Sequence, residues 1–124
     1  IIIRSSIYPG ICNKIYKIIS SKCKNLSYCP ERIVQGRLIS ELPKLPQLVS
    51  GKSKTAILEA SKLFKSVCKK IIHTKVIEAE LVKLFSNAYR YINFSISNQF
   101  YMICQNQDIK EKLKGAYCFL YIEE

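Results

Sequence analysis

The sequence has few of the residues that a metal centre or a membrane span requires. Among its 124 residues there is one histidine, His73, and no tryptophan, and none of the six cysteines forms a C-x-x-C pair. We expect no zinc site, because structural zinc is held by clustered cysteine and histidine ligands. The longest apolar runs are only a few residues, too short to cross a bilayer. The sequence therefore predicts neither a bound metal nor a membrane partner.

A secretory signal is also missing at the start of the sequence. The first residues, Ile1-Ile2-Ile3-Arg4, include no methionine, no basic segment and no cleavage site. A sequence that begins within an apolar triplet suggests a truncated chain. Without a signal for secretion we expect a cytoplasmic location, where thiols stay reduced. Most of the cysteines lie beside apolar residues, so we interpret all six as structural.

Negative charge is scarce, with 9 Asp and Glu residues against 20 Lys and Arg, a net charge of +11. The lysines are spread along the chain in runs no longer than two, and there is no glycine-arginine tract or basic heptad region. This pattern favours a solvated basic surface, and a nucleic-acid-binding domain is the less favoured alternative. We therefore expect no nucleic-acid partner, although the positive field would attract anionic small molecules such as nucleotides to a cleft.

Hydrophobic periodicity and turn residues predict alternating strands and helices. Short apolar runs bounded by turn residues predict four strands, at residues 1–6, 26–29, 47–50 and 70–74. A 3.6-residue spacing predicts one helix over residues 12–22 and a second that begins at Ser53 or Thr55. The expected apolar face of the second helix consists of Ile57, Ala60, Phe64, Val67 and Ile71. Three prolines and Gly36 predict an irregular stretch over residues 30–46, with at most one short helix.

The clearest predicted element is a long helix over about residues 77–105, which contain no glycine or proline. At ~1.5 Å per residue its length is roughly 40 Å. Its apolar stripe consists of Leu81, Phe85, Ala88, Ile92, Ile96, Phe100 and Ile103. Because so long a helix overhangs a small core, we expect it to pack against a second helix, from a partner subunit or from another domain.

The first segment with the residues of a chemical site is CPERIVQG, residues 29–36. Glu31 follows a strand end directly, while Pro30 fixes the entry to the loop and Gly36 permits the exit. Such a loop can line a ligand cleft. The alternative, which the segment favours when taken alone, is a surface turn whose Glu31 pairs with Arg32 or Arg37.

The second such segment lies on the long helix. Lys83 and Asn87 are four residues apart, so their side chains share one face, and Arg90 extends the row. A partly buried amine beside a carboxamide can hold an oxyanion or bind a water molecule. On periodicity alone, a solvent-facing polar row is an equally good interpretation.

Four blocks of sequence, in order over about residues 1–106, resemble the UDP-glucose/GDP-mannose dehydrogenase family. IIIRSSIYPG resembles the late strand of the family's coenzyme domain, and CPERIVQG resembles its substrate loop. LPKLPQLVSG resembles the strand that leads to the central domain, and AELVKLFSNAYRYINFSISNQF resembles the long central helix with its Lys-x-x-x-Asn pair. The second and third blocks are most similar to the branch that acts on UDP-N-acetylmannosamine or UDP-N-acetylglucosamine.

The resemblance implies an α/β fold in three parts. Residues 1–51 would end a Rossmann-like NAD-binding domain, residues 52–106 would form an incomplete helical central domain with the dimerisation helix, and residues 107–124 are a tail of unclear structure. The implied reaction is two successive NAD-dependent oxidations at the sugar C6, from alcohol to carboxylate, for surface polysaccharide synthesis. A dimerisation module without chemistry is the alternative from another class.

The resemblance also implies site residues. Lys83 and Asn87 match the helix pair that steadies the oxyanion and a catalytic water, and Glu31 matches the loop carboxylate that engages that water or the thioester intermediate. Ser6 lies where the family often has threonine, near the nicotinamide. The loop residues expected to contact the nucleotide sugar through their backbone are Arg32, Ile33, Val34, Gln35 and Gly36.

Two of the family's motifs do not occur in the sequence. There is no G-x-G-x-x-G fingerprint for a dinucleotide pyrophosphate, and none of the cysteines lies in the family's Gly-Gly-x-Cys loop. We therefore expect the isolated chain to turn over no substrate.

Overall fold

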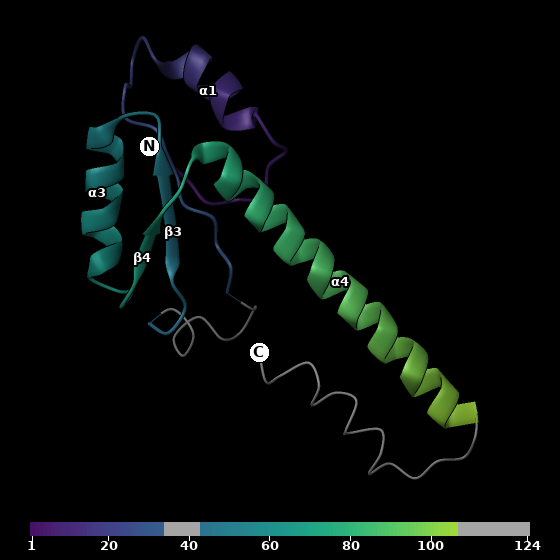
Figure 1. The fold of residues 1–124 in the computed structure, drawn as a ribbon. Helices are drawn as coiled ribbons and strands as arrows, with labels where there is room; N and C mark the ends of the chain where they lie inside the picture. Colours follow the sequence, from purple (N-terminus) through teal and green to yellow (C-terminus); the bar gives the residue numbers. More distant parts are fainter. Residues whose placement is uncertain (34–42, 107–124) are drawn as a thin grey trace. The chain divides into compact units, whose positions relative to one another are not determined.

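A computed structural model describes residues 1–33 and 43–106 of the chain (Figure 1). These described residues divide into two units, the first ending at Phe85 and the second beginning at Ser86. The elements in chain order are β1 (Ile2–Ile3), α1 (Ile11–Ile19), β2 (Ser27–Tyr28), β3 (Gln47–Gly51), α3 (Lys54–Lys65), β4 (Ile71–His73) and α4 (Val76–Asn106). All four predicted strands and all three predicted helices are therefore present, the strands at β1 and β2 being shorter than expected.

The strands form one mixed sheet in the order β1-β2-β3-β4. The β1–β2 and β3–β4 pairs are parallel, and β3 runs antiparallel to β2. The carboxyl ends of β1 and β2 therefore lie at the same edge as the amino ends of β3 and β4. We call this the site edge. Backbone pairing continues past the strand ends there, since the Glu31 amide donates to the Arg4 carbonyl at 3.1 Å.

The larger core cluster lies between the sheet and α3, which packs against β3 and β4 (Figure 1). Its buried members are Cys29, Val49, Ala60 and Phe64. Of the two predicted starts, Ser53 is the N-cap, because its hydroxyl accepts a hydrogen bond from the Ala56 amide at 3.1 Å.

The prediction that Val67 and Ile71 continue the apolar face of α3 was wrong. The helix ends at Lys65, and the Val67 and Cys68 amides both donate to the Phe64 carbonyl in a tightened last turn. Val67 is 44% exposed and Ile71 lies in β4, where it pairs with Gln47. Strand pairing at the β-branched Ile71-Ile72 pair outweighs the helical spacing that the residues also satisfy.

The second core cluster joins the start of α1 to the start of α4. It contains Cys12, Tyr28 and Ala79. Beside it the carboxylate of Glu80, 1% exposed, accepts the amide of Gly10 at 2.7 Å and the amide of Cys12 at 2.9 Å. Its contacts satisfy donors at the N-terminus of α1, where Gly10, the N-cap with φ of 88°, provides no side chain of its own.

Helix α4 runs for 31 residues, which confirms the predicted long helix. Most of its predicted stripe is exposed, with Phe85 at 65%, Ile92 at 57% and Ile103 at 56%. Within the part of the chain that the structure describes, α4 and the other helices are too short or too polar to span a membrane.

Candidate functional site

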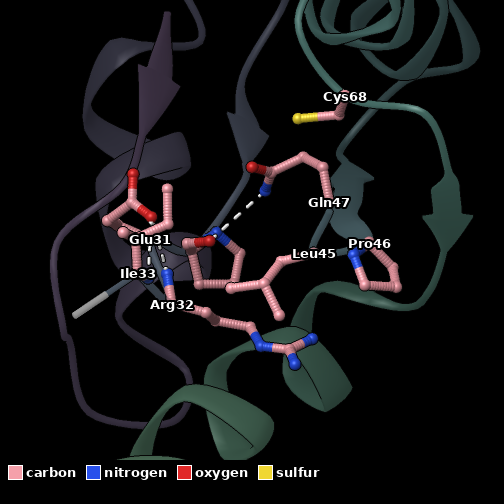
Figure 2. Close-up of a pocket in the computed structure, with 8 residues that line it drawn as sticks. Glu31, Arg32, Ile33, Leu45, Pro46, Gln47 and Cys68 are labelled. Atoms are coloured by element: carbon pink, nitrogen blue, oxygen red, sulfur yellow. Dashed lines mark hydrogen bonds between the residues drawn. The ribbon is translucent and has the colours of Figure 1, made fainter. Parts of the chain in front are cut away.

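A small pocket opens at the site edge of the sheet (Figure 2). It is lined by the segment after β2, the segment before β3 and the turn after α3. The lining residues are Pro30, Glu31, Arg32, Ile33, Leu45, Pro46, Gln47 and Cys68. Both prolines and Leu45 form an apolar wall, whereas Glu31 and Arg32 add charge at the rim. The mixed sheet explains the convergence, since segments distant in sequence all reach this edge.

The Glu31 carboxylate is held by contacts on both oxygens. Oε1 accepts the amide of Arg32 at 2.8 Å and the amide of Ile33 at 3.0 Å, which folds the loop around the carboxylate (Figure 2). Oε2 forms an ion pair with Arg4. The structure thus pairs Glu31 with Arg4, a partner that neither sequence interpretation named, and Arg37 lies outside the described residues.

Arg4 is the residue of this site that sequence reasoning missed. Its guanidinium lies 5.0 Å from the centroid of the Phe64 ring, a cation–π distance, and its Nη2 lies 3.5 Å from Oε1 of Gln47. Gln47 is buried and in turn donates to the Pro30 carbonyl at 3.3 Å. A cationic residue directly after the apolar triplet Ile1-Ile2-Ile3 was the available signal.

Lys83 reaches the same loop from α4. Its side-chain amine donates a hydrogen bond to the main-chain oxygen of Glu31, and the residue is half-buried. The two segments singled out in the sequence therefore meet within the first unit. Asn87 lies one helical turn further along α4, in the second unit, and is also half-buried.

The remaining predicted site residues are placed as follows. Ser6 is exposed and follows β1 at the site edge, where the neighbouring Ser5 carbonyl accepts the Tyr28 hydroxyl at 3.2 Å. Arg32 and Ile33 line the pocket. Val34, Gln35 and Gly36 lie outside the described residues.

Burial makes three thiols in the first unit, those of Cys12, Cys29 and Cys68, poor nucleophiles. It raises the pKa of Cys12 to about 12, with the hydrogen bond to Glu80 as the second cause. Burial also raises the pKa of Cys29 to about 11 and raises that of Cys68. Five cysteines in the described ranges are free thiols, and these ranges contain no group of three or more His, Cys, Asp or Glu side chains that could hold a metal. These thiols fit the structural role predicted for them.

Comparison with known proteins gives a consistent set of relatives, although no family model matches the chain. The chain is 38% identical over 105 residues to the UDP-N-acetyl-D-mannosamine dehydrogenase of Methanococcus vannielii, covering 84% of this chain and 24% of that protein. It is 33% identical over 86 residues to the Escherichia coli K12 enzyme of the same name, covering 68% and 20%.

Solved structures show the same relationship. The UDP-D-ManNAc dehydrogenase of Pyrococcus horikoshii matches with a TM-score of 0.72 and 30% identity over 86% of this chain and 27% of that one. A GDP-mannose dehydrogenase from Pseudomonas aeruginosa matches with a TM-score of 0.75 at 16% identity, over 90% and 28%, which shows a shared fold.

The chain spans about a quarter of the length of the curated relatives it matches. Their identity extends over most of this chain, and the solved UDP-sugar dehydrogenases share its mixed sheet and helices. The family resemblance seen in the four sequence blocks is therefore confirmed. The chain is homologous to a segment of the UDP-N-acetyl-D-mannosamine dehydrogenases and belongs with the nucleotide-sugar dehydrogenases.

Proposed function

We propose that the protein to which this segment belongs is an NAD-dependent nucleotide-sugar 6-dehydrogenase. Its substrate would be a UDP-N-acetylhexosamine, with mannosamine favoured, and its product the corresponding uronate for surface polysaccharide synthesis in the cytoplasm. The observation that carries the proposal is the contact between the Lys83 amine and the Glu31 loop, because it brings a cation and an acid to one sheet edge. The names of the relatives support the substrate class.

In this proposal Lys83 stabilises the oxyanion that develops at the sugar C6. An ammonium group fixed in a partly buried position stabilises such charge more strongly than the same group in water. The amine now donates to the main-chain oxygen of Glu31. The Lys83 amine would therefore already be held in place as a hydrogen-bond donor when the substrate binds. Asn87 is the expected second donor for the oxyanion or for a catalytic water.

Glu31 would engage that water or the covalent intermediate through its carboxylate. Arg4 and the amides of Arg32 and Ile33 hold this carboxylate in one orientation. A group fixed by three donors loses little conformational freedom when substrate binds, which is what positioning for catalysis requires. The backbone from Arg32 to Gly36 is the proposed contact for the nucleotide sugar.

NAD would supply the acceptor for the hydride that leaves C6. The described residues fit one margin of such a cofactor, because Ser6, an exposed residue with a hydroxyl group, follows the carboxyl end of β1. Dinucleotides bind outside the carboxyl ends of parallel strands in this class of fold. The sequence has no G-x-G-x-x-G to hold the pyrophosphate, so we propose that these 124 residues alone do not turn over substrate.

The proposal is tested by NADH formation in the full-length protein with UDP-N-acetyl-D-mannosamine, UDP-N-acetyl-D-glucosamine and UDP-glucose compared in parallel. We expect turnover with an N-acetylated sugar and little with UDP-glucose. A preference for UDP-glucose would refute the assigned branch, and inactivity with all three would refute the proposed function.

A second candidate, a dimerisation module without chemistry, rests on the exposed apolar side chains of α4. Those of its second half are Tyr89, Tyr91, Ile92, Phe94, Ile96, Phe100, Tyr101, Met102 and Ile103. A sedimentation experiment that shows a homodimer, with no binding of UDP-sugars, would favour this candidate. The two candidates share the proposed homodimer and differ only in whether the sugar binds.

A further inference from the structure

We propose that Glu80 is a positioning residue for Lys83, acting through the N-terminus of α1. The proposal rests on the proposed function, since it names a further residue of the same site. Its basis is a single carboxylate that joins two elements 68–70 residues apart in sequence.

The clamp consists of Glu80 and the two amides it accepts, those of Gly10 and Cys12. Glu80 is 1% exposed, and each of its oxygens accepts one amide, at 2.7 Å and 2.9 Å. Helix α1 has no side-chain cap of its own. The long helix therefore supplies the acceptor that α1 lacks, and the two helices cannot move independently without leaving the buried Cys12 amide unpaired.

The clamp lies close to Lys83 along α4. Residues three apart on an α-helix lie on neighbouring positions of one side, with a rise of about 1.5 Å per residue. A fixed Glu80 side chain therefore fixes the turn that carries Lys83 in two ways, in its rotation about the helix axis and in its position along that axis. From that turn the Lys83 amine reaches the Glu31 carbonyl, so the clamp and the site are one helical turn apart.

Three features argue against a role limited to packing. A buried carboxylate is costly compared with a buried apolar residue such as Ala79, which precedes Glu80 on the same helix. The carboxylate also joins two segments of the chain that carry proposed site residues. One is the turn after Ser6, and the other is helix α4, which carries Lys83. Finally, Gly10, whose amide Glu80 accepts, has φ of 88°, a left-handed backbone conformation that residues with side chains rarely adopt.

The test compares Glu80→Gln with the matched control Glu59→Gln, which removes the same charge from an exposed position on α3. Glutamine has one carbonyl oxygen, so one of the two amides loses its acceptor. The first readout is acetylation of the Lys83 amine by limiting acetic anhydride, with exposed Lys75 as internal reference. The second is amide hydrogen exchange in α1 and β3. Neither readout needs a nucleotide sugar, so the result stands whether or not the proposed substrate binds.

We expect Glu80→Gln to raise the acetylation of Lys83 relative to Lys75 about fivefold, the effect of losing one buried hydrogen bond. Amide exchange in α1 should also rise, while the protection of β3 amides stays unchanged. In the Glu59→Gln control, both the acetylation of Lys83 and the exchange in α1 should stay unchanged. Raised exchange in α1 with unchanged acetylation of Lys83 would overturn the proposal, because Glu80 would then only cap α1.

If the β3 amides of Glu80→Gln lose their protection from hydrogen exchange, that variant does not fold. The variant Gly10→Ala then tests whether the clamp positions Lys83. A β-carbon at Gly10 meets nothing within 4 Å, so this variant strains only the backbone at the clamp. Raised acetylation of Lys83 in Gly10→Ala supports the proposal, and unchanged acetylation overturns it.

Discussion

The amine of Lys83 donates to the main-chain oxygen of Glu31 across 52 positions of the sequence. The contact links the long helix to the loop after β2, and the same loop is held from its other side by Arg4. Lys83 lies on α4, and Glu31 lies in the loop after β2. The geometry of the site therefore depends on how the first turns of α4 are placed relative to the sheet within the first unit.

Replacing Lys83 by alanine in the full-length protein should lower kcat about 10²–10³-fold and leave KM nearly unchanged. A donor aimed at a developing oxyanion acts in the transition state and contributes little to ground-state binding. Steady-state kinetics with UDP-N-acetyl-D-mannosamine measures both constants, with Lys75→Ala as the control. An unchanged kcat would show that the contact between Lys83 and Glu31 is structural and that the amine has no catalytic role.

Replacing Arg4 by methionine should lower the free energy of unfolding by about 1–2 kcal/mol. The ion pair with Glu31 is partly exposed and therefore screened, so it contributes about 1 kcal/mol at most, and the contact with Phe64 contributes a similar amount. Urea denaturation measures the change, with Lys14→Met on the exposed side of α1 as control. Equal stability of the two variants would show that Arg4 does not hold the loop.

Stability should fall as pH rises from about 9 to about 12. In the unfolded chain a thiol loses its proton near a pKa of 9.0, whereas folded Cys12 and Cys29 keep theirs up to a pKa of about 12 and about 11. The folded state binds more protons in this window, so the stabilisation is complete below pH 9 and is lost as pH rises through the folded values.

Denaturation at a series of alkaline pH values checks this expectation. The double variant Cys12→Ala, Cys29→Ala should show a shallower loss of stability, although Tyr28 contributes in both proteins because burial raises its pKa to about 12. Identical slopes for the two proteins would contradict the assignment to these thiols.

The chain should form a homodimer through α4, and Ile96→Glu should weaken self-association at least about tenfold, as charges placed in an apolar interface do. Ile96 is 45% exposed in the single chain. Sedimentation velocity over a range of concentrations gives the dissociation constant, and Asn98→Glu is the control on the same helix. A monomer at all concentrations would refute both the dimer and the dimerisation-module alternative.

Local sequence signals predicted the elements well. The unbroken stripe of α4 and the serine that caps α3 are both local features, set by residues within a few turns of one another, and both are confirmed. The pairing of Glu31 with Lys83 needed the family resemblance, because no local pattern relates a loop residue to one so distant on a helix.

The parts that could not be predicted depend on tertiary contacts. Ile71 satisfies both the helical period of α3 and the apolar run of the strand predicted over residues 70–74, and its pairing with Gln47 of β3 decides between the two. Glu80 reads as a polar residue on an exposed helix until the α1 amides that it accepts are known. Arg4 likewise becomes a site residue only through Glu31 and Phe64.

Glu31 takes part in the site through two different chemical groups, its side chain toward Arg4 and its peptide carbonyl toward Lys83. Every amino acid brings that carbonyl, so a mutation at this position deletes the acid and leaves the anchor for the amine intact. Mutation can thus separate the two roles of this residue. Glu31→Ala removes the carboxylate alone, whereas only a change in the backbone conformation of the loop would break the hydrogen bond from Lys83 to the carbonyl.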